Sequence, residues 1–312
     1  MTIFTKTVLN STKTAVITTG IPPIVRFWTY LIFDICSVLC SLFVLYYFLS
    51  IRKLRRARYN HIIIVLLCTG LLKELISVPW TLYRLQVGVP IGHTRSFYLA
   101  SFFFDYALFT TQVMLVAWMT LEKHILIFHA QWLTPKWKCY LLHYLPVITV
   151  LVYCLIYYSV VTFDTFCETS FTAYLAGGYM IPCAYNQTGL AMWELLVHQL
   201  IPTLIIAVFS IAIIVRVVKW KRLLNQPFIW RRQRRMIIHM ISISSLYLIL
   251  NSPWTVTVFA IYFGMSQTNK DIYTIHGLYF QNFIIFFYPF VCFRSSRIFR
   301  KKFKEKLTFC RR

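Results

Sequence analysis

Charged side chains are scarce in this sequence of 312 residues. Asp, Glu, Lys and Arg make up 13% of it and hydrophobic residues 59%, whereas soluble domains carry roughly 25% charged residues. The mean hydropathy is +0.65. A chain with so little charge cannot cover a water-facing surface, which excludes a soluble fold and indicates an integral membrane protein.

Motifs of catalytic and cofactor-binding proteins are also missing. The chain has no glycine-rich phosphate loop, no metal-site spacing of Cys and His, and no convincing pair of nucleophile and base. His143, His198, His239 and His276 are dispersed over four apolar runs, where packing or hydrogen bonding suits each. We therefore expect no enzyme, no cofactor and no metal site.

Seven long apolar runs dominate the sequence, each near the roughly 20 residues that a helix needs to cross the bilayer. None resembles an alternating barrel strand, and neither an internal repeat nor space for a second domain is present. The runs cover approximately residues 28 to 50, 61 to 83, 97 to 121, 140 to 163, 191 to 218, 236 to 263 and 272 to 293.

The predicted fold is all-α and integral to the membrane. An extracellular segment over residues 1 to 27 precedes a bundle of seven transmembrane helices over 28 to 293. Residues 294 to 312 form a short cytosolic amphipathic helix and tail.

Basic residues are unequally divided between the two predicted sides of the membrane. The even-numbered connections and the tail carry 25 Lys and Arg residues, and the other side carries six. Since basic loops stay in the cytosol during insertion, we expect a plasma-membrane protein with its N-terminus outside and its C-terminus inside. Attraction to anionic lipids and partner binding both remain open for the basic tracts. This division along the chain argues against nucleic acid as the partner.

Two glycosylation sequons fall on the predicted outer side, and no other Asn opens one. We predict that Asn10 and Asn186 carry glycans. Glycosidase treatment should increase gel mobility, and Asn10→Gln and Asn186→Gln should each remove part of that shift. Unchanged mobility, together with a C-terminal tag detected on intact cells, would overturn the predicted orientation.

An acid and a base stand side by side at the end of the third run. Glu122, Lys123 and His124 follow a long apolar stretch, and the topology places them at the cytosolic surface, where neither charge has to be buried. Residues 25 to 309 resemble the rhodopsin-like G-protein-coupled receptors, and this triplet resembles a variant of their Asp/Glu-Arg-Tyr motif. The resemblance implies contact with helix six at rest and with a heterotrimeric G protein in the active state.

Prolines supply further similarity to this family. Pro202, Pro253 and Pro289 resemble the prolines of helices five, six and seven, where a missing backbone donor permits a kink. Tyr288 stands in place of the Asn in the helix-seven Asn-Pro-x-x-Tyr motif, and Asn251 in place of the helix-six Trp. The resemblance assigns Pro253, Tyr288 and Pro289 to the switch region.

Other family positions carry different residues. Gly70 replaces an Asp and Ser41 an Asn, so the family's sodium-binding cluster should be absent. Tyr98 stands where the family has the Cys that ties down the outer loop. Cys167 and Cys183 are then expected to pair with each other in the oxidising compartment and to close the loop on itself.

The end of the chain resembles the family's short eighth helix. Residues 295 to 309 place Phe299, Phe303 and Leu307 on one face among basic residues, as in a helix lying among lipid head groups. Cys310 at its end is a candidate for palmitoylation.

Four ionisable residues lie inside the apolar runs: Asp34, Lys73, Glu74 and Asp105. Such residues usually face the interior of the bundle. Asp105 precedes Lys123 by 18 residues, which is about 27 Å along a helix and places it near the outer mouth.

Two interpretations of Asp105 stay open. Its position resembles that of the amine-binding Asp in aminergic receptors, but Lys73 on the neighbouring helix could instead hold it in an ion pair. With Glu74 and Trp254, these two residues form the expected ligand-binding set.

The sequence predicts a receptor that binds an unknown extracellular ligand and signals to heterotrimeric G proteins. The alternative is a transporter or channel that uses Lys73, Glu74 and Asp105; the odd helix count and the lack of repeated halves weigh against it. A retinal-binding opsin is not expected, because residues 272 to 293 contain no Lys.

Overall fold

Seven membrane-length helical segments confirm the predicted all-α membrane fold. The computed structural model describes residues 21–87, 95–128, 135–163, 187–223, 227–264 and 267–295. The elements are α2 (Pro23–Ser50), α3 (Arg52–Arg55), α4 (Arg58–Val87), α5 (Arg95–Phe128), α6 (Lys136–Cys139), η2 (Tyr140–Tyr144), α7 (Leu145–Phe163), α8 (Thr188–Trp193), η4 (Glu194–Leu200), α9 (Ile201–Leu223), α10 (Pro227–Tyr262) and α11 (Gln267–Ser295).

Most helices extend several residues beyond their apolar runs. Backbone hydrogen bonding does not stop where apolar side chains stop, and Arg and Lys are good helix formers. Accordingly, α4 begins at Arg58, α5 continues past Lys123 to Phe128, and α10 begins at Pro227 ahead of its basic stretch. A proline is well tolerated at a helix start, because its missing N–H would have no partner there.

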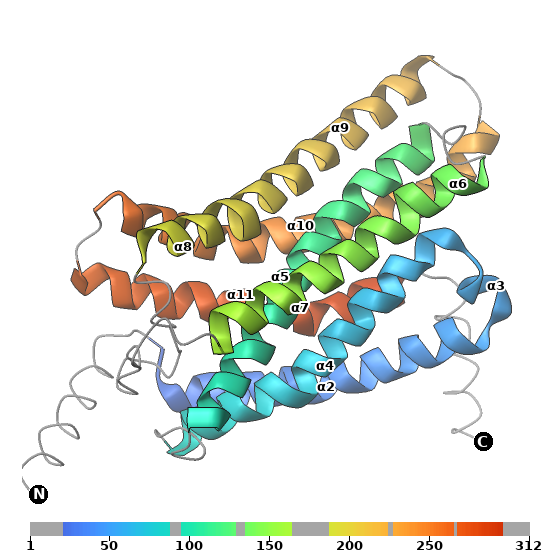
Figure 1. The fold of residues 1–312 in the computed structure, drawn as a ribbon. Helices are drawn as coiled ribbons and strands as arrows, with labels where there is room; N and C mark the ends of the chain where they lie inside the picture. Colours follow the sequence, from blue (N-terminus) through green and yellow to red (C-terminus); the bar gives the residue numbers. More distant parts are fainter. Residues whose placement is uncertain are drawn as a thin grey trace, which may run out of the picture.

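Consecutive spans run antiparallel, and α5 lies centrally in the bundle, against α4, α7, α9 and α10 (Figure 1). The bundle closes on itself because the last span, α11, packs against both α2 and α10. We call the end of the bundle at which α5 begins the pocket end, and the end at which α5 finishes the tail end.

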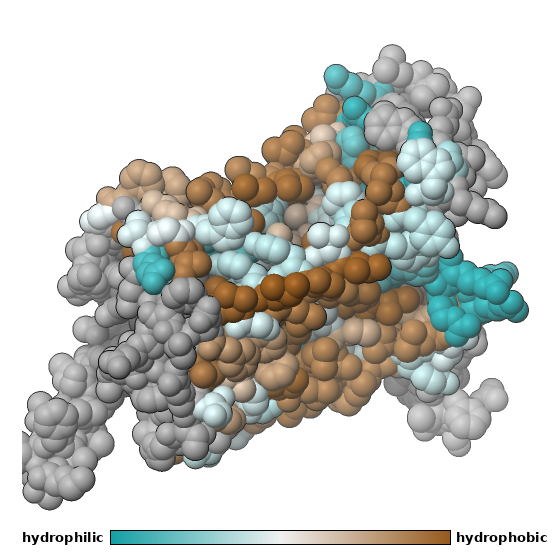
Figure 2. All heavy atoms as spheres, viewed as in Figure 1, coloured by the Kyte–Doolittle hydropathy of each residue, from teal (hydrophilic) through white to brown (hydrophobic). Residues whose placement is uncertain are grey.

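The outside of the bundle is more apolar than parts of its inside. Leu39, Ile211 and Ile249 project outward with exposures of 64%, 61% and 68%, whereas Ser37 and Ser41 of α2 are buried. Figure 2 shows hydrophobic side chains across the middle of this face and the most hydrophilic ones towards its ends. This pattern suits helices that face lipid on one side and a polar interior on the other.

Two spans contain a π-helical segment just before a proline. Pro146 is the second residue of α7, directly after η2, and Pro202 is the second residue of α9, directly after η4. A proline cannot donate to the preceding turn and its ring crowds that turn, so a wider turn accommodates it. The expected distortion at Pro202 is therefore a π turn.

Several predicted features lie outside the described residues. They are the sequons at Asn10 and Asn186, the pairing of Cys167 with Cys183, the amphipathic helix after residue 295 and the lipidation of Cys310. Each stays a prediction.

Candidate functional site

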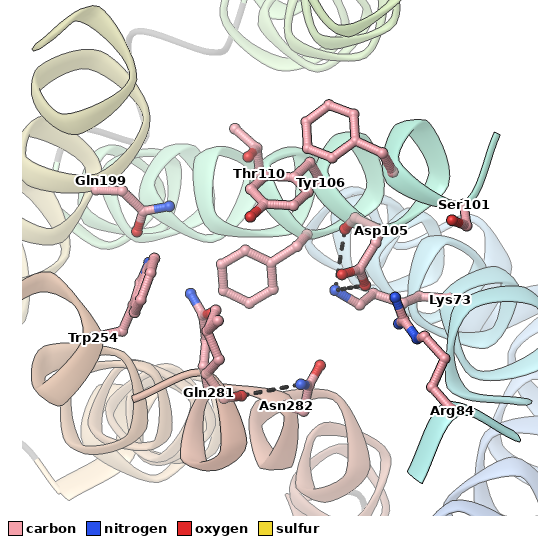
Figure 3. Close-up of a pocket in the computed structure, with 13 residues that line it drawn as sticks. Lys73, Arg84, Ser101, Asp105, Tyr106, Thr110, Gln199, Trp254, Gln281 and Asn282 are labelled. Carbon is pink, nitrogen blue, oxygen red and sulfur yellow. Dashed lines mark hydrogen bonds and ion pairs between the residues drawn. The ribbon is translucent and has the colours of Figure 1, made fainter. Parts of the chain in front are cut away.

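A pocket opens among α4, α5, η4, α10 and α11 near the pocket end of the bundle. It encloses about 610 Å³, including the part that is open to solvent. Its charged groups, Lys73, Arg84 and Asp105, lie together, across the pocket from Gln199 and Trp254 (Figure 3). Three of the four residues in the expected ligand-binding set, Lys73, Asp105 and Trp254, therefore lie in one cavity.

Lys73 and Asp105 form an ion pair, which was one of the two interpretations left open by the sequence. Lys73 Nζ lies 2.9 Å from Asp105 Oδ1 and donates to the Asp105 carbonyl oxygen at 3.1 Å. It also sits 4.8 Å from the ring centroid of Phe109. The two side chains differ in exposure, 4% for Lys73 and 35% for Asp105. The lysine is thus enclosed, while the carboxylate reaches the pocket.

Arg84 is a pocket residue that the sequence analysis did not select. It follows the second apolar run directly, where a basic residue is ordinary. It lies 11 residues after Lys73, which is about three turns of helix, so the two side chains share one face of α4. Extending the helical period past the end of the run would have found it.

Glu74 does not line the pocket, which corrects its place in the expected ligand-binding set. One residue turns a helix by about 100°, so Glu74 faces α2 while Lys73 faces α5. The Glu74 carboxylate accepts hydrogen bonds from Ser37 and Ser41 of α2. It therefore joins two helices away from the ligand cavity.

Gln112 occupies the space next to Gly70. A Cβ atom built on Gly70 would lie 3.0 Å from Gln112 Nε2. The glycine thus makes room for an uncharged amide from α5.

One side of the pocket connects to α10 and α9 by hydrogen bonds. Gln281 Nε2 on α11 donates to Asn251 Oδ1 at 3.0 Å, and Asn251 Nδ2 donates to Thr203 Oγ1 on α9 at 3.3 Å. Asn251 lies two residues before Pro253, which interrupts the backbone ladder of α10. A ligand that moves Gln281 would therefore act on α10 next to its proline.

Gly277 allows α11 to approach Trp254 closely. A Cβ atom on Gly277 would lie 3.1 Å from Trp254 Cα and 3.2 Å from Cε3, whereas one on Gly189 would meet nothing within 4 Å. We predict that Gly277→Ala lowers stability relative to Gly189→Ala by about 1 to 3 kcal/mol, the usual cost of overpacking. Alanine favours helix at both sites, so the comparison isolates the contact.

Thermal unfolding of the two purified variants measures this difference. A Gly277→Ala midpoint equal to or above that of Gly189→Ala would show that α10 and α11 separate there without cost.

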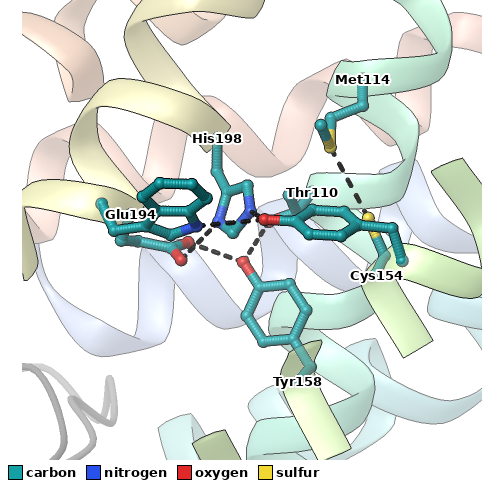
Figure 4. Close-up of polar contacts among 8 residues, drawn as sticks. Thr110, Met114, Cys154, Tyr158, Glu194 and His198 are labelled. Atoms are coloured by element: carbon teal, nitrogen blue, oxygen red, sulfur yellow. Dashed lines mark hydrogen bonds and ion pairs between the residues drawn. The ribbon is translucent and has the colours of Figure 1, made fainter. Parts of the chain in front are cut away.

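A second polar network joins α5, α7 and η4 beside the pocket (Figure 4). Tyr158 donates to Glu194 at 2.6 Å and contacts the Thr110 hydroxyl, a pocket group, at 2.6 Å. Glu194 also contacts His198 Nδ1 at 2.6 Å, and His198 Nε2 lies 2.9 Å from the Tyr153 hydroxyl. His198 thus has the hydrogen-bonding role expected of it, in a network that spans three helices.

The expectation that Glu122 and Lys123 emerge at the surface is wrong. Glu122, Lys123 and His124 are only 3%, 1% and 7% exposed. The reason is that α5 continues to Phe128 and neighbouring helices enclose its last turns. The Glu122 carboxyl group is buried in contact with His143 Nδ1 of η2, a partner whose nearness in space the sequence does not reveal.

The Glu122 pair belongs to a longer chain of contacts at the tail end. His143 Nε2 lies 3.0 Å from His61 Nδ1 on α4, and His61 Nε2 lies 2.9 Å from the carbonyl oxygen of Arg55. A carbonyl only accepts, so His61 Nε2 carries a hydrogen and a neutral His61 accepts from His143. Glu122 and His143 must then share one further proton, held on the ring or on the carboxyl group.

Lys123 is the enclosed charge between α5 and α10. Its Nζ lies 3.4 Å from His239 Nδ1 on α10, and no carboxylate of the described residues lies within ion-pair distance of it. Of the other predicted switch residues, Tyr288 is 3% exposed and Pro289 lies inside α11. Lys123 of α5 therefore contacts α10 through this histidine.

Comparison with known proteins supports the fold. No family model matches the sequence and no curated protein is similar to it. The crystal structure of squid rhodopsin matches with a TM-score of 0.70, covering 93% of this chain and 87% of that chain at 16% sequence identity. The chain therefore has a rhodopsin-like fold of seven membrane helices.

Proposed function

We propose that this membrane protein is a receptor that binds a ligand in the pocket and signals to a heterotrimeric G protein at its tail end. The observation that supports this most is the connection from the pocket through Gln281 and Asn251 to α10. The same helix carries His239, the contact of Lys123, 12 residues nearer the tail end than Asn251. The proposed ligand pocket and the proposed G-protein site therefore both contact α10.

Because α10 is long, a small rotation near the pocket would displace its distant residues by several ångströms. Pro253 and His239 are 14 residues apart, which is about 21 Å of helix. Rotation by about 10° at the proline would displace His239 by roughly 4 Å. Such a displacement would separate His239 from Lys123 and expose the ammonium group.

The intramembrane charges support a receptor over a channel or transporter. An ion path needs ionisable groups facing one route. Here Lys73 and Asp105 neutralise each other, while Glu74 is turned towards the serines of α2. These charges thus join different pairs of helices, α4 to α5 and α2 to α4, and do not line one route.

The proposal places the pocket on the extracellular side of the plasma membrane and the basic connections in the cytosol, next to anionic lipids and the G protein. The proposal includes no opsin-type Schiff base within residues 272 to 293, because that run contains no Lys.

A nucleotide-exchange screen tests this function. Reconstituted protein, representative G proteins of each Gα class and a broad ligand panel should yield at least one ligand that accelerates exchange. Gln281→Leu should abolish that response by breaking the link to Asn251. Phe280→Leu, on the exposed face of the same helix, should leave it unchanged. A silent panel, combined with ion currents through the purified protein in planar bilayers, would favour the channel instead.

A further inference from the structure

Among the described residues that line the pocket, three are charged, and only two of these are paired with each other. Lys73 and Asp105 lie 2.9 Å apart and cancel each other. Arg84 completes the charged side of the cavity (Figure 3). The described lining of the pocket therefore carries a net charge of one positive unit, located on the Arg84 guanidinium group.

Arg84 has unusually few partners for an arginine that faces a cavity inside a membrane bundle. Its Nη2 donates to Thr81 Oγ1 at 3.0 Å, but its Nε is enclosed and has no hydrogen-bond partner among the described residues. No acidic side chain in that part of the structure forms an ion pair with it. Arg84 itself is partly exposed and lines the pocket, so its guanidinium can pair with an incoming anion through charge-assisted hydrogen bonds.

We propose that the pocket binds a small organic monoanion whose carboxylate pairs with Arg84, an inference that rests on the proposed ligand site. A guanidinium presents a planar fork of donors that matches a carboxylate with two parallel hydrogen bonds. A monoanion brings the net charge of the pocket to zero. An ammonium ligand would raise it to two positive units, and a dianion would reverse its sign.

The rest of the lining defines the body of this anion. Phe102, Phe109 and Trp254 contribute aromatic surface, and Gln199 and Gln281 contribute amides. Figure 3 places Trp254 and Gln199 across the cavity from Arg84. The fitting ligand is a carboxylate on an aromatic or apolar body, with space for a hydrogen-bonding group at its far end.

The sign of the ligand charge can be tested with three probes that share one skeleton. They are 4-phenylbutyrate, 4-phenylbutan-1-ol and 4-phenylbutan-1-amine, measured by saturation-transfer NMR on the full chain in phosphatidylcholine nanodiscs, with empty nanodiscs subtracted. The acid should bind at least tenfold more tightly than the alcohol, as a charge-assisted pair requires. Arg84→Gln should remove this preference, and Arg84→Lys should retain part of it.

Arg52→Gln provides the matched control, because it removes an exposed arginine on α3 at the opposite end of the bundle. It should leave the preference for the acid intact. The inference is overturned if the wild type prefers the amine, if it does not distinguish acid from alcohol, or if Arg84→Gln binds the acid as well as the wild type does.

This binding measurement contains no G protein, so it separates the two proposals. Binding of the acid through Arg84 without any ligand-stimulated exchange would leave the anion site standing and reject the signalling role. Exchange driven only by uncharged or cationic ligands would keep the receptor and reject the anion site.

Discussion

Asp105→Asn should remove most of the protein from the cell surface. The substitution leaves the Lys73 ammonium, which is 4% exposed, without its counter-ion. Stranding one partner of a buried pair costs about 3 to 5 kcal/mol, a large share of the roughly 5 to 15 kcal/mol that holds a protein folded. Surface labelling and thermal unfolding measure the loss.

The reverse change should be milder. Lys73→Met strands Asp105, whose side chain is 35% exposed and still reaches the pocket, so the expected cost is about 1 to 2 kcal/mol, well below that of a fully buried charge. The double variant Lys73→Met/Asp105→Asn should recover surface expression, since no charge is left alone. If Asp105→Asn instead keeps normal expression and loses only the ligand response, Asp105 is an amine anchor and the structural pair is unimportant.

Lys123→Met should increase thermal stability and reduce ligand-stimulated nucleotide exchange at least tenfold. Enclosing an ammonium that has no carboxylate within ion-pair distance costs several kcal/mol. That cost is present only while α10 covers Lys123, so the charge favours opening of the tail end. Methionine removes the cost, and about 1.4 kcal/mol of added closed-state stability already shifts the equilibrium tenfold.

Lys123→Arg separates charge from side-chain shape. It keeps the positive charge in the same place, so exchange should remain measurable. The explanation fails if Lys123→Met signals like the wild type, or if it unfolds at a lower temperature, because the enclosed charge would then stabilise the resting state.

The sequence predicts the helices well because the requirement for crossing a bilayer is local. About 20 apolar residues suffice to mark each span, and the seven runs correspond to the seven helical segments. This rule marks only the part of a helix that lies within hydrocarbon. It therefore ends the third helix before Lys123, whereas α5 continues to Phe128. Burial of Glu122 depends on η2, and no local pattern reports that neighbour.

Part of the pocket could be predicted because its signal is also local in the sequence. Asp105 and Lys73 stand out because a charge within an apolar run is rare. Arg84 stands at the edge of a run, where arginine is ordinary, and only its helical phase relative to Lys73 distinguishes it. Glu74 was misplaced because adjacency in sequence suggested a shared site, although neighbouring residues on a helix point in different directions.

A distance measurement across the tail end tests the central claim, that α10 moves there to admit a G protein. Spin labels on p-azidophenylalanine at Tyr140 of η2 and Ile238 of α10, both exposed, leave the native cysteines untouched. Adding nucleotide-free G protein should create a population whose labels lie about 4 Å or more farther apart, as the lever length of α10 predicts. A distribution that stays the same with representatives of every Gα class would contradict the account.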